Sequence, residues 1–192
     1  MLNKYLFILI IVSLLTGCSG NQELKDLFRS DISNLLSAYN NSEWEKAADM
    51  LYPKFFLAVR RSQVIETWKH LDSAGMTRRF KLKEIDKVSE ILTAGNEEFC
   101  RVFYSVEIEI TLNPLQYENI EHFIEDFDED YGKENVTYDE GGHKFTINAR
   151  QSVIAVTVKD SGTWKYMELN NEHAFDIVAQ AVPKEIMKKL TN

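Results

Sequence analysis

The stretch FCRVFYSVEIEITL, residues 99–112, decides the fold. Successive side chains of a β-strand point to opposite faces of the sheet, so a period of two in hydrophobicity indicates a strand with one buried face. The period holds here over fourteen residues, because polar side chains and Phe103 alternate with an apolar series. That series, which we expect to be buried, comprises Cys100, Val102, Tyr104, Val106, Ile108, Ile110 and Leu112.

Further strands are predicted on both sides of this stretch. Residues 80–93 alternate in part and end at a turn, Ala94-Gly95-Asn96. Residues 144–159 and 163–169 form two more apolar segments, separated by Asp160-Ser161-Gly162, which is typical of a hairpin turn. The pattern therefore predicts an antiparallel meander.

Helical periodicity dominates the chain before the strands. A helix is predicted from residue 23, and Ser42 is expected to cap a second helix with Glu45 three residues later. Pro53 ends that helix, and a third is expected from about residue 62 to Gly75. Residues 172–190 are predicted to form two short helices around Pro183. The apolar face of the first helix comprises Leu24, Phe28, Ile32, Leu35, Leu36 and Tyr39.

Residues 116–142 interrupt the meander with an acidic insertion. From Glu118 to Glu140 the chain carries ten Asp and Glu residues against one basic residue, Lys133. Ile120, Phe123, Ile124 and Phe127 are nevertheless placed at helical spacing. We expect an amphipathic helix followed by a mobile acidic loop.

Helices followed by an antiparallel sheet make an α+β fold. The order resembles the nuclear transport factor 2-like (cystatin-like) family, whose members curve a sheet around helices into a cone. Small exported proteins of this fold from Bacteroidetes-type bacteria, many without known function, are similar. The resemblance covers residues 23–190 and implies a domain over residues 23–192. The insertion at residues 116–142 departs from the compact family pattern, and we expect it at the mouth of the cone. It is carried by Ser42-Glu43-Trp44, Tyr52-Pro53-Lys54-Phe55-Phe56, Thr163-Trp164-Lys165-Tyr166 and Pro183-Lys184-Glu185.

The N-terminus has the parts of an export signal. Lys4 precedes a short apolar run, which is too short to span a bilayer as a stable helix. Leu15-Thr16-Gly17-Cys18 resembles the bacterial lipobox. This resemblance implies that residues 1–17 are a signal peptide cleaved between Gly17 and Cys18, that Cys18 carries a lipid, and that residues 18–22 are a tether. An ordinary signal peptide, or a signal anchor with an incidental cysteine, is the alternative.

Lipid on Cys18 predicts an exported protein, anchored in a membrane on the periplasmic or outer-surface side of the cell envelope. Cleavage would leave 175 residues and take the net charge from −8 to −9. A negative chain lacks the basic footprint that nucleic acid requires. Since Cys18 is committed to lipid, Cys100 has no partner, and we expect a buried structural thiol.

Catalytic signatures are not recognisable in the sequence. Enzymes of the family, such as ketosteroid isomerase and polyketide cyclases, use an acid or base in the cone, but no such motif transfers to this chain. His70, His122, His143 and His173 do not pair at helical spacing, so no local metal site and no cofactor are predicted. Candidate pocket residues are Trp68, Tyr104, Trp164 and Tyr166, although aromatic residues at such spacings are usually core residues, and we favour a core position for them.

Asp126, Asp128 and Asp130 alternate as in a calcium loop. An EF-hand needs Gly at position six and Glu at position twelve, where this chain has Tyr131 and Thr137. The EF-hand interpretation therefore fails. A looser calcium site and a solvated acidic helix are the alternatives, and we favour the helix.

Three functions fit the sequence. The favoured one is a membrane-anchored binding or accessory module, whose partner is an envelope protein or a small hydrophobic ligand. The second is an enzyme acting on a small molecule in the cone, of the isomerase, cyclase or dehydratase type. The third is a structural subunit of an envelope complex.

Overall fold

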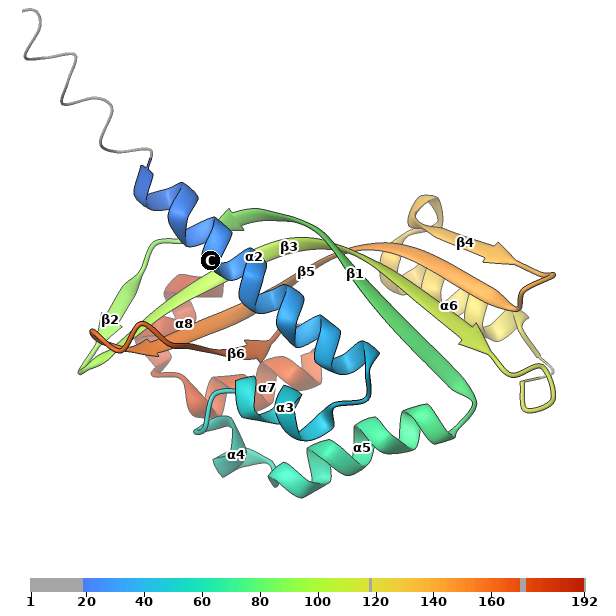
Figure 1. Ribbon diagram of the computed structural model, residues 1–192, viewed down its shortest axis with the longest axis horizontal. Coiled ribbons are helices and arrows are strands. Elements are labelled where there is room, and N and C mark those ends of the chain that lie inside the picture. Colours follow the sequence, from blue (N-terminus) through green and yellow to red (C-terminus); the bar gives the residue numbers. More distant parts are fainter. Residues whose placement is uncertain (1–18, 118, 170–171, 192) are drawn as a thin grey trace, which may run out of the picture.

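The computed structural model describes residues 19–117, 119–169 and 172–191 and has the predicted α+β fold (Figure 1). Cys18 and residues 1–17, which are predicted to be a signal peptide, lie outside the described residues. The helices are α2 (Ser19–Asn40), α3 (Trp44–Met50), α4 (Phe55–Ala58), α5 (Arg61–Ser73), α6 (Glu121–Tyr131), α7 (Glu172–Ala181) and α8 (Lys184–Thr191), with a 3-10 turn η1 (Lys133–Asn135). The strands are β1 (Met76–Val88), β2 (Leu92–Ala94), β3 (Glu97–Leu112), β4 (Val136–Asp139), β5 (Lys144–Val158) and β6 (Trp164–Glu168).

Strand β3 is the centre of a strongly curled antiparallel sheet. The order is β1-β3-β5-β4, with β2 paired to β3 and β6 paired to β5. The whole predicted apolar series of β3 is buried, none of it more than 6% exposed, which confirms the predicted strand and its face. Register shifts between Leu82 and Glu84, and between Ile85 and Lys87, interrupt the pairing of β1 with β3. Such bulges bend a strand and increase its twist.

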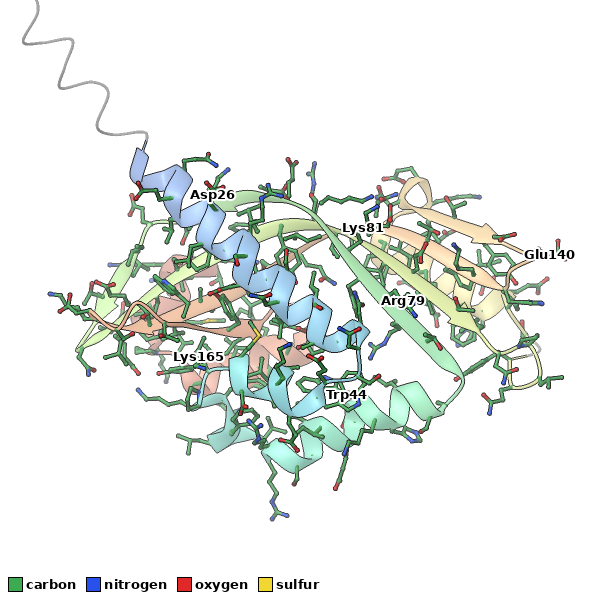
Figure 2. All side chains as sticks on the ribbon, in the orientation of Figure 1. Asp26, Trp44, Arg79, Lys81, Glu140 and Lys165 are labelled. Atoms are coloured by element: carbon green, nitrogen blue, oxygen red, sulfur yellow. The ribbon has the colours of Figure 1, made fainter. Side chains whose placement is uncertain are left out.

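The sheet separates two hydrophobic cores. Val153 and Ala155 of β5 face the core that includes α2 and α3, whereas Ile154 and Val156 face a second core built with α7 and α8. The sheet is therefore covered on both faces at this end, so β5 is apolar at consecutive positions. Figure 1 shows α2 lying across β1 and β3, with α3 to α5 beside it and α6 at the far end of the sheet. Figure 2 shows charged side chains such as Asp26, Arg79 and Lys81 on the outer surface.

The N-terminal helices correct two predictions. Helix α2 begins at Ser19, four residues earlier than expected, so residues 19–22 are helical rather than an extended tether. Glu43, not Ser42, is the N-cap of α3, and it makes no side-chain cap hydrogen bond. Ser42 has a φ of 55° and belongs to the turn between the helices. None of the described helices is long and apolar enough to span a bilayer.

The acidic insertion is more ordered than expected. Its helix, α6, is confirmed, but the predicted mobile loop is wrong. Residues 133–135 form the turn η1, and β4 pairs with β5 from Val136↔Ile147 to Asp139↔Lys144. The insertion is thus attached to the sheet by backbone hydrogen bonds as well as by its apolar face, including Phe127, whose ring centroid is 5.0 Å from that of Phe145.

Candidate functional site

An inner cavity of about 520 Å³ lies between the sheet, the N-terminal helices and α6. Its size is in the range of small-molecule sites, which combine an apolar lining with a few convergent polar groups. Helix α6 contributes five of the lining residues, so the insertion does form a wall of this cavity. The aromatic lining comprises Tyr39, Trp44, Trp68, Phe80, Tyr104, Phe123, Phe127 and Tyr131.

Tyr39 stands at the centre of the aromatic wall. Its ring centroid is 5.2 Å from that of Trp68, 6.1 Å from that of Phe80 and 6.5 Å from that of Trp44. Edge-on and tilted ring contacts of this kind fix the orientation of each ring. The wall is therefore formed by side chains from α2, α3, α5 and β1 that hold one another in place.

Two hydrogen-bonded pairs place polar groups in the same cavity. The Tyr39 hydroxyl donates to Glu168 Oε1 over 2.9 Å. The Tyr104 hydroxyl donates to Gln151 Oε1 over 3.1 Å. Arg78 also lines the cavity, which gives it a cation beside these carbonyl and carboxyl oxygens.

Burial shifts the acidities of these groups. It raises the pKa of Glu168, against the hydrogen bond from Tyr39 and the charge of Arg78, which both lower it. Burial and the nearby Glu168 carboxyl raise the pKa of Tyr39 and of Tyr104. Both phenols therefore stay protonated as donors, and the Glu168 carboxyl holds its proton to a higher pH than an exposed one.

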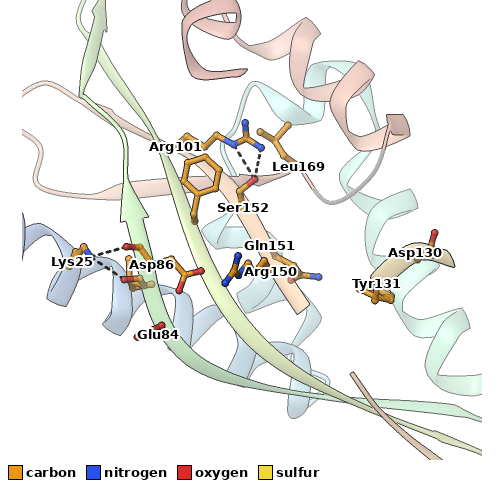
Figure 3. Close-up of a pocket in the computed structure, with 12 residues that line it drawn as sticks. Lys25, Glu84, Asp86, Arg101, Asp130, Tyr131, Arg150, Gln151, Ser152 and Leu169 are labelled. Carbon is orange, nitrogen blue, oxygen red and sulfur yellow. Dashed lines mark hydrogen bonds between the residues drawn. The ribbon is translucent and has the colours of Figure 1, made fainter. Parts of the chain in front are cut away.

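A second, outer groove of about 750 Å³ is more charged (Figure 3). Lys25 Nζ donates to the carbonyl oxygens of Ile85 and Asp86. Arg101 donates to Ser152 Oγ from both Nε and Nη2. The inner cavity, which combines an aromatic wall with a few polar groups, is closer to the usual lining of a small-molecule site than this charged groove.

The inner cavity and the outer groove meet at the edge of β5. Asp130, Tyr131 and Gln151 line both. Among the described strands, β4 pairs with β5 only as far as Ile147, and β6 pairs with it only from Val153. Leu169 N–H also donates to the Ser152 carbonyl oxygen over 3.0 Å, so the part of this edge that no described strand covers ends at Gln151, which lines both spaces.

The four predicted pocket residues divide into two pairs. Trp68 and Tyr104 line the inner cavity. Trp164 and Tyr166 are core residues, with ring centroids 5.1 and 6.4 Å from that of Phe28. Tyr166 also donates a hydrogen bond of 2.6 Å to Asp31 Oδ2. The structure therefore does not bring the four together.

The three aspartates of the calcium hypothesis lie on the regular helix α6. Asp126 and Asp130 line the inner cavity, whereas Asp128 is absent from its lining. In the part of the chain that the structure describes, no group of three or more His, Cys, Asp and Glu side chains could hold a metal ion. His122 is 3.4 Å from Asp126, and His143 Nδ1 is 3.5 Å from the Tyr138 hydroxyl.

Sequence reasoning missed Arg78, Gln151 and Glu168. Each occupies a strand position on the buried face, where the alternation of polar and apolar residues along the strand predicts an apolar side chain. Arg78 precedes Phe80 and Leu82 by even steps, and Glu168 follows Trp164 and Tyr166 in the same way. Gln151 continues the buried series Phe145, Ile147 and Ala149. A polar residue on the apolar face of a strand was the available signal.

Comparison with known proteins leaves the family open. No protein-family model matches the chain, and no curated protein does. One similar solved structure is the intermembrane space region of chloroplast protein ARC6, with 9% identity and a TM-score of 0.42, over 74% of this chain and 91% of that chain. Another is a putative dehydratase from the NTF2-like family from Streptomyces avermitilis, with 9% identity and a TM-score of 0.36, over 72% and 88%. Similarity at this level carries no argument about function. The chain is an α+β protein with helices packed on a strongly curled antiparallel sheet.

Proposed function

We propose that the protein is a lipid-anchored binding module of the cell envelope, and that its inner cavity takes a small, partly apolar molecule. The carrying observation is the lining of the cavity, where an aromatic wall meets the Tyr39–Glu168 and Tyr104–Gln151 pairs. Apolar surface supplies affinity, and a few fixed polar groups supply orientation. The outer groove is lined mainly by charged and polar side chains, among them Lys25, Arg101 and Arg150, and has no comparable aromatic wall in the residues that the structure describes.

The proposal that the cavity holds a small molecule is tested by identifying what the native protein has bound. The full-length chain is purified from its own membranes and denatured, and the released small molecules are identified by mass spectrometry. A Trp68→Ala variant, which opens the aromatic wall, should release less of the same compound than the wild type. A matched Leu57→Ala variant, altered at a side chain that is 85% exposed, should release as much. Equal release from all three chains would count against a ligand in the cavity.

The anchoring part rests on the lipobox resemblance of Leu15-Thr16-Gly17-Cys18. Two or three acyl chains hold a domain firmly at a bilayer, because each buried CH₂ contributes about 0.8 kcal/mol. Cells fed labelled palmitate should label the wild-type protein and leave a Cys18→Ala variant unlabelled. An unlabelled wild-type protein would show that Cys18 is not a lipid site.

A second candidate function is supported by Glu168. Burial raises the pKa of the Glu168 carboxyl inside the cavity, and a carboxyl with a raised pKa is a candidate for general acid–base catalysis. The enzyme hypothesis predicts that the wild-type chain depletes a compound from a small-molecule extract of the source cells. Glu168→Gln should abolish that depletion without releasing the ligand. If the two chains leave identical extracts, the cavity binds without catalysis.

A further inference from the structure

Arg78 brings a guanidinium to the wall of the inner cavity. Along β1, Arg78 and Phe80 are partly buried, while Arg79 and Lys81 are exposed on the outer surface (Figure 2). The Arg78 guanidinium carbon is 6.0 Å from the centroid of the Phe80 ring. Arg78 makes no hydrogen bond and no ion pair with any residue that the structure describes. Its five N–H donors are therefore not used by described protein groups, and Arg78 lines the cavity.

The acidic side chains of the cavity do not neutralise Arg78 at contact distance. Asp126, Asp130 and Glu168 line the same space, but none forms an ion pair with Arg78 within 4.0 Å. Glu168 accepts the Tyr39 hydrogen bond. Asp126 is 52% exposed and lies beside His122, and Asp130 is exposed to water. A solvated carboxylate loses little by staying unpaired, whereas a partly buried cation gains more from a partner.

We propose that Arg78 binds the carboxylate of the ligand, and that the apolar part of that ligand packs against the aromatic wall around Tyr39. This inference rests on the proposed function and names the chemical class of the molecule bound. The planar guanidinium fork matches a carboxylate through two parallel hydrogen bonds. A carboxylate, with a single charge, suits the site better than a doubly charged phosphate, because three acidic side chains already line the cavity.

The test uses two probes of the same shape, 2-naphthoate and its uncharged amide, 2-naphthamide. The full-length chain in detergent is titrated with each by calorimetry, and protein-free micelles provide the blank. Wild type should bind naphthoate more tightly than naphthamide. Arg78→Gln should weaken naphthoate binding by about tenfold or more, the effect of losing hydrogen bonds to a charged group, and should change naphthamide binding by less than about twofold. Arg79→Gln, at the neighbouring exposed position, should change neither.

The outcomes separate the inference from the proposed function. If Arg78→Gln weakens both probes equally, or neither, then Arg78 does not recognise the carboxylate, while the cavity remains a binding site. If neither probe binds to the wild type, the binding function fails and the inference fails with it. Thermal melting and circular dichroism establish that the variants are folded. Should Arg78→Gln not fold, Arg78→Lys tests the fork alone, because it keeps the charge: it should weaken naphthoate binding and leave naphthamide binding unchanged, and an equal effect on both probes would contradict the inference.

Discussion

The hydroxyl of Tyr39 donates a hydrogen bond to Glu168 over 2.9 Å, although the two residues are 129 positions apart in the chain. Tyr39 lies in the last turn of α2, and Glu168 is the last residue of β6. The contact thereby joins the first described helix to the final strand across the inner cavity. It also makes the stability of the fold depend on the protonation of one carboxyl.

Glu168→Gln should make the pH dependence of stability flatter. Because burial raises the pKa of Glu168, the folded chain keeps a proton that the unfolded chain releases at about pH 4.3. The free energy of unfolding of the wild type therefore falls as pH rises from that value through the raised pKa. Urea unfolding from pH 4 to pH 8 should show a stability advantage of the variant that grows with pH. Glu90→Gln, at an exposed side chain, should follow the wild type, and parallel curves for Glu168→Gln would contradict the prediction.

Phe28→Ala should destabilise the fold strongly. Phe28 is 0% exposed and holds Trp164 and Tyr166 edge-on. Removing a buried aromatic ring leaves a cavity, so the free energy of unfolding should drop by about 3–5 kcal/mol. Urea unfolding followed by circular dichroism measures the loss. Leu57→Ala, at a side chain that is 85% exposed, should stay within about 0.5 kcal/mol. Similar values for both variants would show that Phe28 is not a core residue.

Cys100 should be unreactive in the folded protein. The thiol is buried, which raises its pKa to about 12, and the thiolate is the reactive form. In a chain carrying Cys18→Ser, Cys100 is the sole thiol, and Ellman's reagent at pH 8 should react with it only after urea is added. Val158→Cys, at a side chain that is 48% exposed, should react at once. Rapid reaction of Cys100 in native buffer would place this thiol at the surface.

Arg101→Gln should loosen α8. Besides its hydrogen bonds to Ser152, Arg101 donates from Nη1 to the carbonyl oxygen of Leu190 over 3.2 Å. A hydrogen bond from a charged donor contributes about 1.5–3 kcal/mol, and the value for Arg101 should lie near the lower end because its side chain is only partly buried. Amide hydrogen exchange in α8 should speed up by about tenfold, while exchange in α6 stays unchanged. Lys81→Gln, on the exposed side of β1, serves as the control. Unaltered exchange in α8 would mean that the helix is held by its apolar face alone.

Local periodicity predicted the elements that bury most of their own surface. The alternation in β3 extends over several residue pairs, and the helical spacing in α2 extends over several turns. Both patterns place the buried side chains correctly. The hairpin at Asp160-Ser161-Gly162 is also confirmed, with positive φ at Asp160 and Gly162. Such signals need no knowledge of distant partners, because a single element carries the whole pattern.

The candidate site depended on information that no single element carries. Strand β4 has four residues in an acidic segment, and its pairing with β5 becomes favourable only once the sheet exists. The Tyr39–Glu168 contact requires the curl of the sheet to bring α2 against β6. Arg78 was missed because the strand was predicted to start at Phe80, whereas β1 starts at Met76. Side chains near strand ends are the least constrained by periodicity, and Arg78 and Glu168 both lie near the end of a strand.

The start of α2 at Ser19 has a mechanical consequence for a chain anchored at Cys18. A helix of 22 residues is about 33 Å long. The buried side chains of Phe28 and Ile32 hold the middle turns of α2 in the core. A flexible linker would let the domain reorient freely above the bilayer, so that every side of the domain would face the membrane in turn. A lipid attached directly to this helix would instead transmit the tilt of α2 to the whole domain. The entrance of the cavity would then keep a constant orientation relative to the membrane. Inserting two Gly residues before Gln22 should abolish this fixed orientation.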